Sequence, residues 1–262
     1  MEKTGLKLRV DVNCDLGESY GHFKTGCDEE VMSHISSANI ACGFHAGDPM
    51  VMERSVKLAK QHNVAVGAHP GFPDLMGFGR REMKLSREEV KNYIIYQIGA
   101  LQAFVRTVGT GLQHVKPHGA LYNLAMKDTA LARAIVEGIT AFDSDLTVFT
   151  QAKSELAKVA TKASLRVAYE VFADRAYNPD GSLVSRTVSG AVIEDPKMVA
   201  ERAIKMVKEK RVVAVDGKLV DLGEVDTICV HGDNLKAVTL VKSLRNGLQK
   251  AGISVVSVGK RV

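Results

Sequence analysis

One short stretch of the sequence, residues 38–49, constrains the possible fold more than any other. It reads A-N-I-A-C-G-F-H-A-G-D-P. The apolar run 40–42 is typical of a strand buried on both faces, and Gly43 ends that run. Asp48 followed by Pro49 is typical of a helix N-cap and a first helical residue. The stretch therefore predicts a strand, a polar turn that carries His45, and a helix.

The same order of elements recurs along the chain. We predict strands at residues 6–14, 40–42, 64–68, 113–117, 146–149, 166–173, 227–230 and 253–258. We predict helices at residues 28–35, 49–62, 86–108, 128–139, 153–161 and 195–209, and one more before the last strand. Strands that alternate with helices indicate a mostly parallel sheet. A closed or nearly closed barrel of about seven strands fits 262 residues better than an open sheet.

The chain shows no change of composition and no flexible linker that would divide it. We therefore expect a single (β/α) barrel domain over residues 1–262. Asp216 and Gly217 lie between two apolar runs, which predicts a hairpin insertion near residues 211–222. Residues 183–188 are expected to be extended. Ser86 and Glu89 form a capping-box pattern at the start of the long helix.

Composition favours some classes of protein over others. No apolar run reaches membrane-spanning length, and the first residues lack the apolar centre of a signal peptide, so we expect a cytoplasmic protein without a membrane partner. The net charge is only +5, aromatic residues make up 5% and Trp is absent, which argues against nucleic acid as a partner. The four cysteines form no C-x-x-C pair, which is typical of buried thiols in a reducing compartment.

Polar residues recur where the predicted strands end. The set comprises Asp15, His45, His69, Lys116, His118, Asp174, Arg175, His231 and Asp233, and includes four of the eight histidines. If these ends meet at one barrel mouth, the side chains form a cup suited to acid–base catalysis. Imidazole and carboxylate groups are also ligands for divalent metals. Hydrolysis of an amide-type bond is the natural reaction class.

Simpler explanations exist for each of these residues. A single histidine can cap a turn. Whether a metal is bound stays open, because no H-E-x-x-H or H-x-x-x-H spacing is present and the ligands would have to meet across strands. Asp11, Asn13 and Asp15 share one parity and would face the barrel interior. Residues 70–85 form a long loop with apolar residues, which predicts an ordered lid or rim. Its Arg80 and Arg81 either bind an anion or form ordinary ion pairs.

Several long motifs resemble the LamB/YcsF family. They are D-V-N-C-D-L-G-E (11–18), residues 38–49, G-A-H-P-G-F-P-D-L-M-G-F-G-R-R (67–81), V-K-P-H-G-A-L-Y-N (115–123), E-V-F-A-D-R-A-Y (170–177), G-S-L-V-S-R (181–186) and V-H-G-D (230–233). The resemblance implies a distorted (β/α) barrel similar to glycoside hydrolases and carbohydrate deacetylases. It also implies cleavage of 5-oxo-L-proline to L-glutamate with ATP as co-substrate, together with 5-oxoprolinase subunits B and C.

These considerations give two sets of expected site residues. We expect catalytic roles for Asp15, His45, His69, Lys116, His118, Asp174 and His231. We expect substrate binding by Asn13, Arg80, Arg81, Glu170, Arg175 and Arg186. Two other functions remain open: a stand-alone metal-dependent deacetylase or carbohydrate hydrolase, and a subunit that only delivers the substrate.

Overall fold

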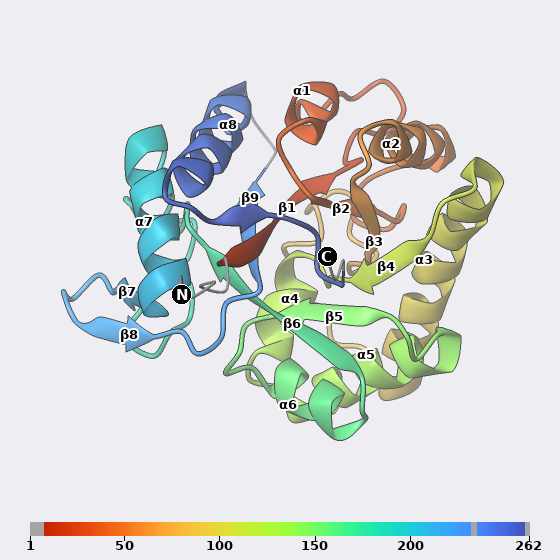
Figure 1. Ribbon diagram of the computed structural model, residues 1–262. Coiled ribbons are helices and arrows are strands. Elements are labelled where there is room, and N and C mark those ends of the chain that lie inside the picture. The colour runs from red at the N-terminus through yellow and green to blue at the C-terminus, as the bar shows by residue number, and fades with distance from the viewer. Residues whose placement is uncertain (1–7, 232–234, 260–262) are drawn as a thin grey trace, which may run out of the picture.

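Seven parallel strands close into a barrel that helices surround (Figure 1). The computed structural model describes residues 8–231 and 235–259. The barrel strands are β1 (Arg9–Leu16), β2 (Ser37–Ala41), β3 (Ala65–His69), β4 (Leu112–Val115), β5 (Thr147–Thr150), β6 (Arg166–Phe172) and β9 (Thr227–His231). They pair in this order, and β9 pairs back onto β1 to close the ring. The predicted barrel is therefore confirmed.

The helices lie outside this ring (Figure 1). They are α1 (Asp28–Met32), α2 (Pro49–Gln61), α3 (Arg87–Val108), α4 (Gly119–Ala125), α5 (Thr129–Phe142), α6 (Glu155–Lys162), α7 (Pro196–Glu209) and α8 (Leu235–Lys250). The short strand β10 (Ser254–Val255) pairs with the beginning of β1. Strands β7 (Arg211–Val213) and β8 (Leu219–Asp221) form an antiparallel hairpin beside α7, outside the barrel. No helix in the described ranges is long and apolar enough to cross a membrane.

Helix starts follow the sequence closely. The Asp48 carboxylate accepts a hydrogen bond from the Val51 amide at 2.9 Å, which caps α2. Ser86 and Glu89 form both hydrogen bonds of a capping box at the start of α3. Such caps satisfy backbone N–H groups that have no partner inside the helix, and each contributes about 1 kcal/mol.

The alternating pattern of β1 separates an apolar layer from a polar interior. Val10, Val12, Cys14 and Leu16 are buried in the hydrophobic core that the strands share with the helices. Residues of the other parity form polar contacts across the barrel, since Asn13 on β1 bonds Glu170 on β6, which is not a neighbouring strand. Polar side chains therefore make up much of the barrel interior.

Some expected elements differ from the structure. Helix α4 was not predicted, because the sequence pattern indicated only a strand end and His118 there. Helix α1 ends at Met32, and Asp28 does not cap it; its carboxylate accepts a hydrogen bond from the Gly17 amide at 2.9 Å. Residues 183–188 form no strand; only an isolated bridge joins Tyr177 to Leu183. The first two residues of the predicted strand at 6–14 lie outside the described residues.

Candidate active site

The carboxyl ends of the barrel strands bring the predicted polar residues together. His69 is the last residue of β3, Asp15 lies near the end of β1, and Lys116 follows β4 directly. His45 occupies the turn after β2, where the Gly43 amide bonds the Ala46 carbonyl. Because parallel strands all end on the same side of a barrel, these side chains share one mouth.

Lys116 joins the carboxylates of the site. Its ammonium nitrogen lies 3.0 Å from Asp15 Oδ1 and 2.9 Å from Glu170 Oε1, and its side chain is almost fully buried. Burial alone would lower the pKa of Lys116, but Asp15 and Glu170 among its neighbours raise that pKa well above the ordinary value. Lys116 is therefore a permanent cation between two carboxylates.

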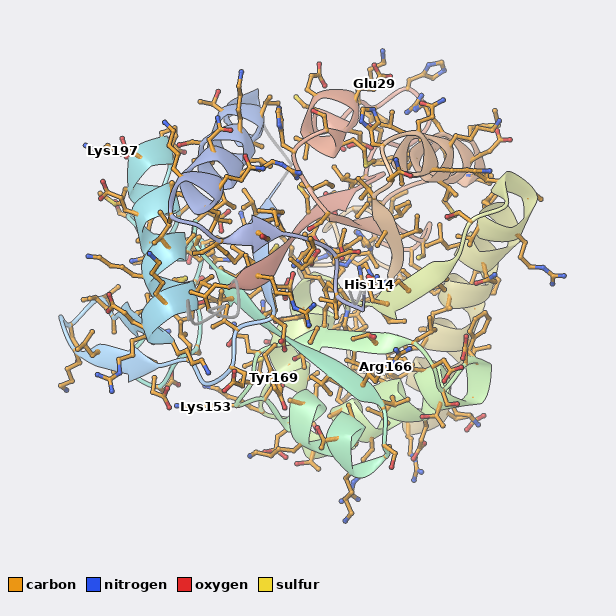
Figure 2. The ribbon with its side chains drawn as sticks, in the orientation of Figure 1. Glu29, His114, Lys153, Arg166, Tyr169 and Lys197 are labelled. Carbon is orange, nitrogen blue, oxygen red and sulfur yellow. The ribbon has the colours of Figure 1, made fainter. Side chains whose placement is uncertain are left out.

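A column of paired polar groups extends from Lys116 into the barrel. Asn13 donates to Glu170 and to Thr227, and its Oδ1 accepts from Asn39 at 2.8 Å. Asn39 Oδ1 accepts from His114 Nε2 at 2.8 Å. His114 is fully buried, and Figure 2 labels it near the strands, away from the peripheral Glu29, Lys153 and Lys197. Burial lowers the pKa of His114 to about 3, so its ring is neutral.

Above Lys116, three histidines and a glutamate form a compact buried cluster. His118 Nδ1 lies 2.9 Å from His69 Nε2 and 3.6 Å from Glu18 Oε1. His45 Nε2 lies 3.3 Å from the same Glu18 oxygen. The rings of His45 and His118 stack at 3.6 Å between centroids, with an interplanar angle of 3°. His69 Nε2 lies 3.4 Å from Asp15 Oδ2, which connects the cluster to the Lys116 group.

Two glycines make room for this cluster. A Cβ atom on Gly71 would lie 2.8 Å from His45 Nδ1, and one on Gly79 would lie 2.7 Å from His45 Cβ and 2.8 Å from His118 Cδ2. Gly79 also has a φ of +63°, a conformation that residues with a side chain rarely adopt. The glycines of the 70–85 loop therefore allow its backbone to lie directly against the imidazole rings.

Burial keeps two of the imidazoles uncharged. Burial, together with His69, lowers the pKa of His45 well below the ordinary value. The pKa of His118 is lowered in the same direction by burial and by its neighbours His45 and His69. Both rings are therefore neutral at pH 7 and can accept a proton or bind a cation. The donor atoms of Glu18, His45, His69 and His118 all lie within 4.8 Å of one another, so the group could hold a metal ion.

A cavity of about 1020 Å³ opens next to the cluster. Asp15, Glu18, Lys116 and His118 are part of its wall. Cations line it as well, and these include Arg80, Arg175 and Arg186. A cavity of this size lies at the upper end of the range for small-molecule sites, so it has room for more than one small reactant.

The arginines predicted to bind substrate differ in their surroundings. Arg80 lines the cavity and stacks over the Phe78 ring, with its guanidinium carbon 5.0 Å from the ring centroid. Arg81 forms an ion pair with Asp74 and does not line the cavity. Arg175 donates to the backbone carbonyls of Val184 and Ala191, and burial lowers its pKa to about 10.

Three other predicted residues lie at different depths. Glu170 is buried inside the barrel beside Lys116, whereas Asp174 is buried after β6 without lining the cavity. His231 ends β9, where its backbone is in register with Asp15. The side chain of His231 and the whole of Asp233 lie outside the described residues.

Sequence reasoning missed several groups of this site. Glu18 belongs to one of the motifs but was assigned no role, although its carboxylate contacts two histidines. Tyr122, on the unpredicted helix α4, lines the cavity, and burial and Glu170 raise its pKa well above the ordinary value. Asn39 and His114 could have been found from strand parity, because each lies at an inward position of its strand.

The closed parallel barrel with acid–base groups at its strand ends defines an α/β-barrel protein with a polar site at the barrel mouth. The LamB/YcsF family model matches residues 10–262, and the chain belongs to the LamB/YcsF family. The resemblance stated from the sequence motifs is thereby confirmed.

Relatives of known name are similar over almost their whole length. The A subunit of 5-oxoprolinase from Pyrococcus abyssi is 61% identical over 249 residues, which cover 95% of this chain and 97% of that protein. The crystal structure of a lactam utilization protein from Thermus thermophilus matches with a TM-score of 0.90 at 48% identity, covering 95% of this chain and 99% of that one. A GH113 β-1,4-mannanase, at 11% identity and a TM-score of 0.51 over 93% of this chain and 99% of that one, shares the fold alone.

Proposed function

We propose that this chain is a subunit of an ATP-dependent 5-oxoprolinase, which cleaves 5-oxo-L-proline to L-glutamate with hydrolysis of ATP to ADP and phosphate. The observation that carries this proposal is the pairing of an acid–base cluster with a cation-lined cavity in a chain so similar to proteins named as the A subunit of 5-oxoprolinase. The name of those relatives implies further subunits, and we propose that subunits B and C are the partners.

The chemistry explains why ATP would be needed. A five-membered lactam is an unreactive amide, and transfer of a phosphoryl group to its oxygen converts that oxygen into a leaving group. Water then attacks the ring carbon, the ring C–N bond breaks as the nitrogen is protonated, and a second water hydrolyses the resulting acyl phosphate to the carboxylate and phosphate. His118 and Asp15, which line the cavity, are placed to move these protons. Lys116 would hold Asp15 in its ionised, oriented form.

The substrate carboxylate and phosphate need cations. Arg80 and Arg186 line the cavity and are our candidates for these anions, since guanidinium groups bind carboxylates through charge-assisted hydrogen bonds. Arg81 and Arg175 were expected in the same role. Arg81 forms an ion pair with Asp74, and Arg175 donates hydrogen bonds to backbone carbonyls. We therefore assign both arginines a mainly positioning role in the rim of the cavity.

The 70–85 loop is our candidate for part of the boundary with the partner subunits. Its Leu75 and Met76 are exposed, with relative exposures of 40% and 89%. Two residues after Met76, the carbonyl of Phe78 accepts a hydrogen bond from His118, so the loop connects the proposed contact surface to the site. A site completed by a partner would also keep water away from a phosphorylated intermediate. All four cysteines are free thiols, in keeping with a proposed cytoplasmic location.

The test is an assay of 5-oxoproline-dependent ATP hydrolysis with the chain alone and with subunits B and C. We expect little or no activity from the chain alone and full activity on mixing. In the mixture, Arg80→Ala should weaken substrate binding by about tenfold. The adjacent Arg81→Ala is the matched comparison and should have a smaller effect.

Two results of this assay would contradict the proposal. Turnover by the isolated chain at the rate of the mixture would exclude the dependence on partners. No stimulation of the mixture by 5-oxoproline would exclude the reaction itself. A third result would favour a subunit that only delivers the substrate. In that case the isolated chain binds 5-oxoproline, and the turnover of the mixture survives the loss of His118.

A further inference from the structure

His69 and His118 face each other through the ring nitrogens that do not contact backbone carbonyls. His69 Nδ1 lies 2.7 Å from the backbone carbonyl of Lys116, and His118 Nε2 lies 2.8 Å from the carbonyl of Phe78. A carbonyl oxygen can only accept a hydrogen bond, so both of these nitrogens carry the ring proton. In neutral rings the remaining nitrogens, His69 Nε2 and His118 Nδ1, are then lone-pair sites, and they lie 2.9 Å apart.

Two lone pairs at this distance repel each other unless a cation lies between or beside them. The Glu18 carboxylate adds negative charge to the same point, with its Oε1 atom 3.6 Å from His118 Nδ1. His45 brings a third imidazole, whose Nε2 lies 3.3 Å from that oxygen. The other nitrogen of His45 is buried and makes no hydrogen bond within the described structure. The cluster is thus assembled from groups that bind cations.

The spacing of these atoms matches the ligands of a small metal ion. Ligands about 2.0–2.1 Å from one ion lie about 2.9–3.4 Å from each other, in octahedral and tetrahedral geometry respectively. Three of the six separations in the cluster, 2.9, 3.3 and 3.6 Å, fall in or close to this range, and all the donor atoms lie within 4.8 Å of one another. The backbone carbonyls that hold the ring N–H groups of His69 and His118 play the part that such carbonyls play for metal-binding histidines elsewhere.

The charge around the cluster is also suitable. The carboxylates of Glu18 and Asp15 contact its imidazoles, and Lys116 ion-pairs with Asp15 and with Glu170 below the cluster. Carboxylate oxygens beside neutral imidazole nitrogens are a donor set that attracts a divalent cation.

We propose that Glu18, His45, His69 and His118 bind one divalent transition-metal ion of the Zn²⁺ class. Three imidazoles and one carboxylate favour such ions over Mg²⁺ or Ca²⁺, which prefer oxygen ligands. Because Glu18 and His118 also line the cavity, the bound ion would supply positive charge where an oxyanion develops. The inference concerns ion binding by this chain and holds whether or not the proposed reaction with ATP is correct.

Metal binding by the full chain provides the test. The purified chain is treated with a chelator, dialysed and titrated with Zn²⁺ and with Co²⁺, and bound metal is measured by elemental analysis and calorimetry. We expect about one ion per chain and a rise in Tm on addition of Zn²⁺. For Co²⁺ we expect the visible absorption bands of a site with nitrogen ligands.

Variants identify the site. Glu18→Gln keeps the size of the side chain and should weaken Zn²⁺ binding by at least about tenfold, as should His118→Ala. The exposed His62→Gln is the matched control for a histidine outside the cluster and should bind Zn²⁺ as the unaltered chain does. Should His118→Ala fail to fold, the near-isosteric Glu18→Gln still decides the question.

Three outcomes would overturn the proposal. The first is no saturable binding of either ion. The second is binding that is the same in Glu18→Gln as in the unaltered chain, which would place the ion elsewhere. The third is an NMR signal of a proton shared between His69 and His118 that excess Zn²⁺ does not displace. None of these readouts uses 5-oxoproline or ATP, so failure here is distinguishable from failure of the proposed reaction.

Discussion

The polar column inside the barrel and the histidine cluster at its mouth are built from similar residues but differ in how completely these residues are paired. In the column, Asn13 and Asn39 use both their amide nitrogens and their oxygens in hydrogen bonds. In the cluster, His69 Nε2 and His118 Nδ1 face each other at 2.9 Å, and two neutral rings held by their backbone carbonyls would have no proton to place between these atoms. Completely paired groups stabilise a fold, whereas groups that need an additional cation or proton are suited to chemistry.

The largest expected effect is a loss of turnover when a residue of the histidine cluster is replaced. His118→Ala, in the mixture with subunits B and C, should lower turnover by at least about 100-fold, because a group that transfers protons or binds the ion is lost. The complex should still assemble, since His118 is at the mouth and its removal leaves the column intact. Initial rates and size-exclusion chromatography check these two expectations. Turnover close to that of the unaltered chain would show that the cluster is not the reactive part of the site.

Lys116 lies between the two regions, and its loss should affect stability. Lys116→Met leaves the carboxylates of Asp15 and Glu170 without their common cation, which should lower the free energy of unfolding by about 3–5 kcal/mol. Urea denaturation measures this. Lys153→Met is the matched control, because Lys153 forms an exposed ion pair with Asp221 that is worth at most about 1 kcal/mol. Equal losses in the two variants would contradict a special role for the buried pair.

The barrel was predictable from the sequence because local patterns determine it. Short apolar runs, glycine and proline punctuation and N-capping residues such as Asp48 and Ser86 are read within a few positions of the chain. The convergence of strand ends on one mouth then follows from parallel topology alone. Helix α4 was missed because its seven residues are too short for a clear helical period.

The pairing inside the site was much less predictable. Nothing local distinguishes Arg80 from Arg81, yet Arg80 lines the cavity and Arg81 pairs with Asp74. Glu18 reaches His45 and His118 only because the turn after β1 folds over the barrel mouth. Such contacts join residues far apart in the sequence, and they depend on loop conformations that periodicity does not encode.

The smallest expected effect concerns His114 in the column and its response to pH. Burial lowers the pKa of His114 to about 3 in the folded chain, against about 6.5 when unfolded. Below pH 6.5 the unfolded chain therefore binds a proton that the folded chain does not, and stability is lost as the pH falls toward 3. Two carboxyl groups act in the opposite direction, because burial raises the pKa of Asp11 and of Asp28 to about 6. The profile of the unaltered chain is thus a sum, and only a difference between variants isolates His114.

His114→Gln retains a donor toward Asn39 but cannot titrate. Between pH 7.5 and 5.5, His114 should cost the unaltered chain about 1.4 kcal/mol of stability that the variant does not lose. Urea denaturation at a series of pH values measures the gap. Asn39→Ala, which breaks the same hydrogen bond without removing an ionisable group, should instead lower stability by a similar amount at each pH. If His114→Gln and the unaltered chain gave parallel profiles of stability against pH, His114 would have the same pKa in the folded and the unfolded chain. The column would then be open to protons, as the mouth is.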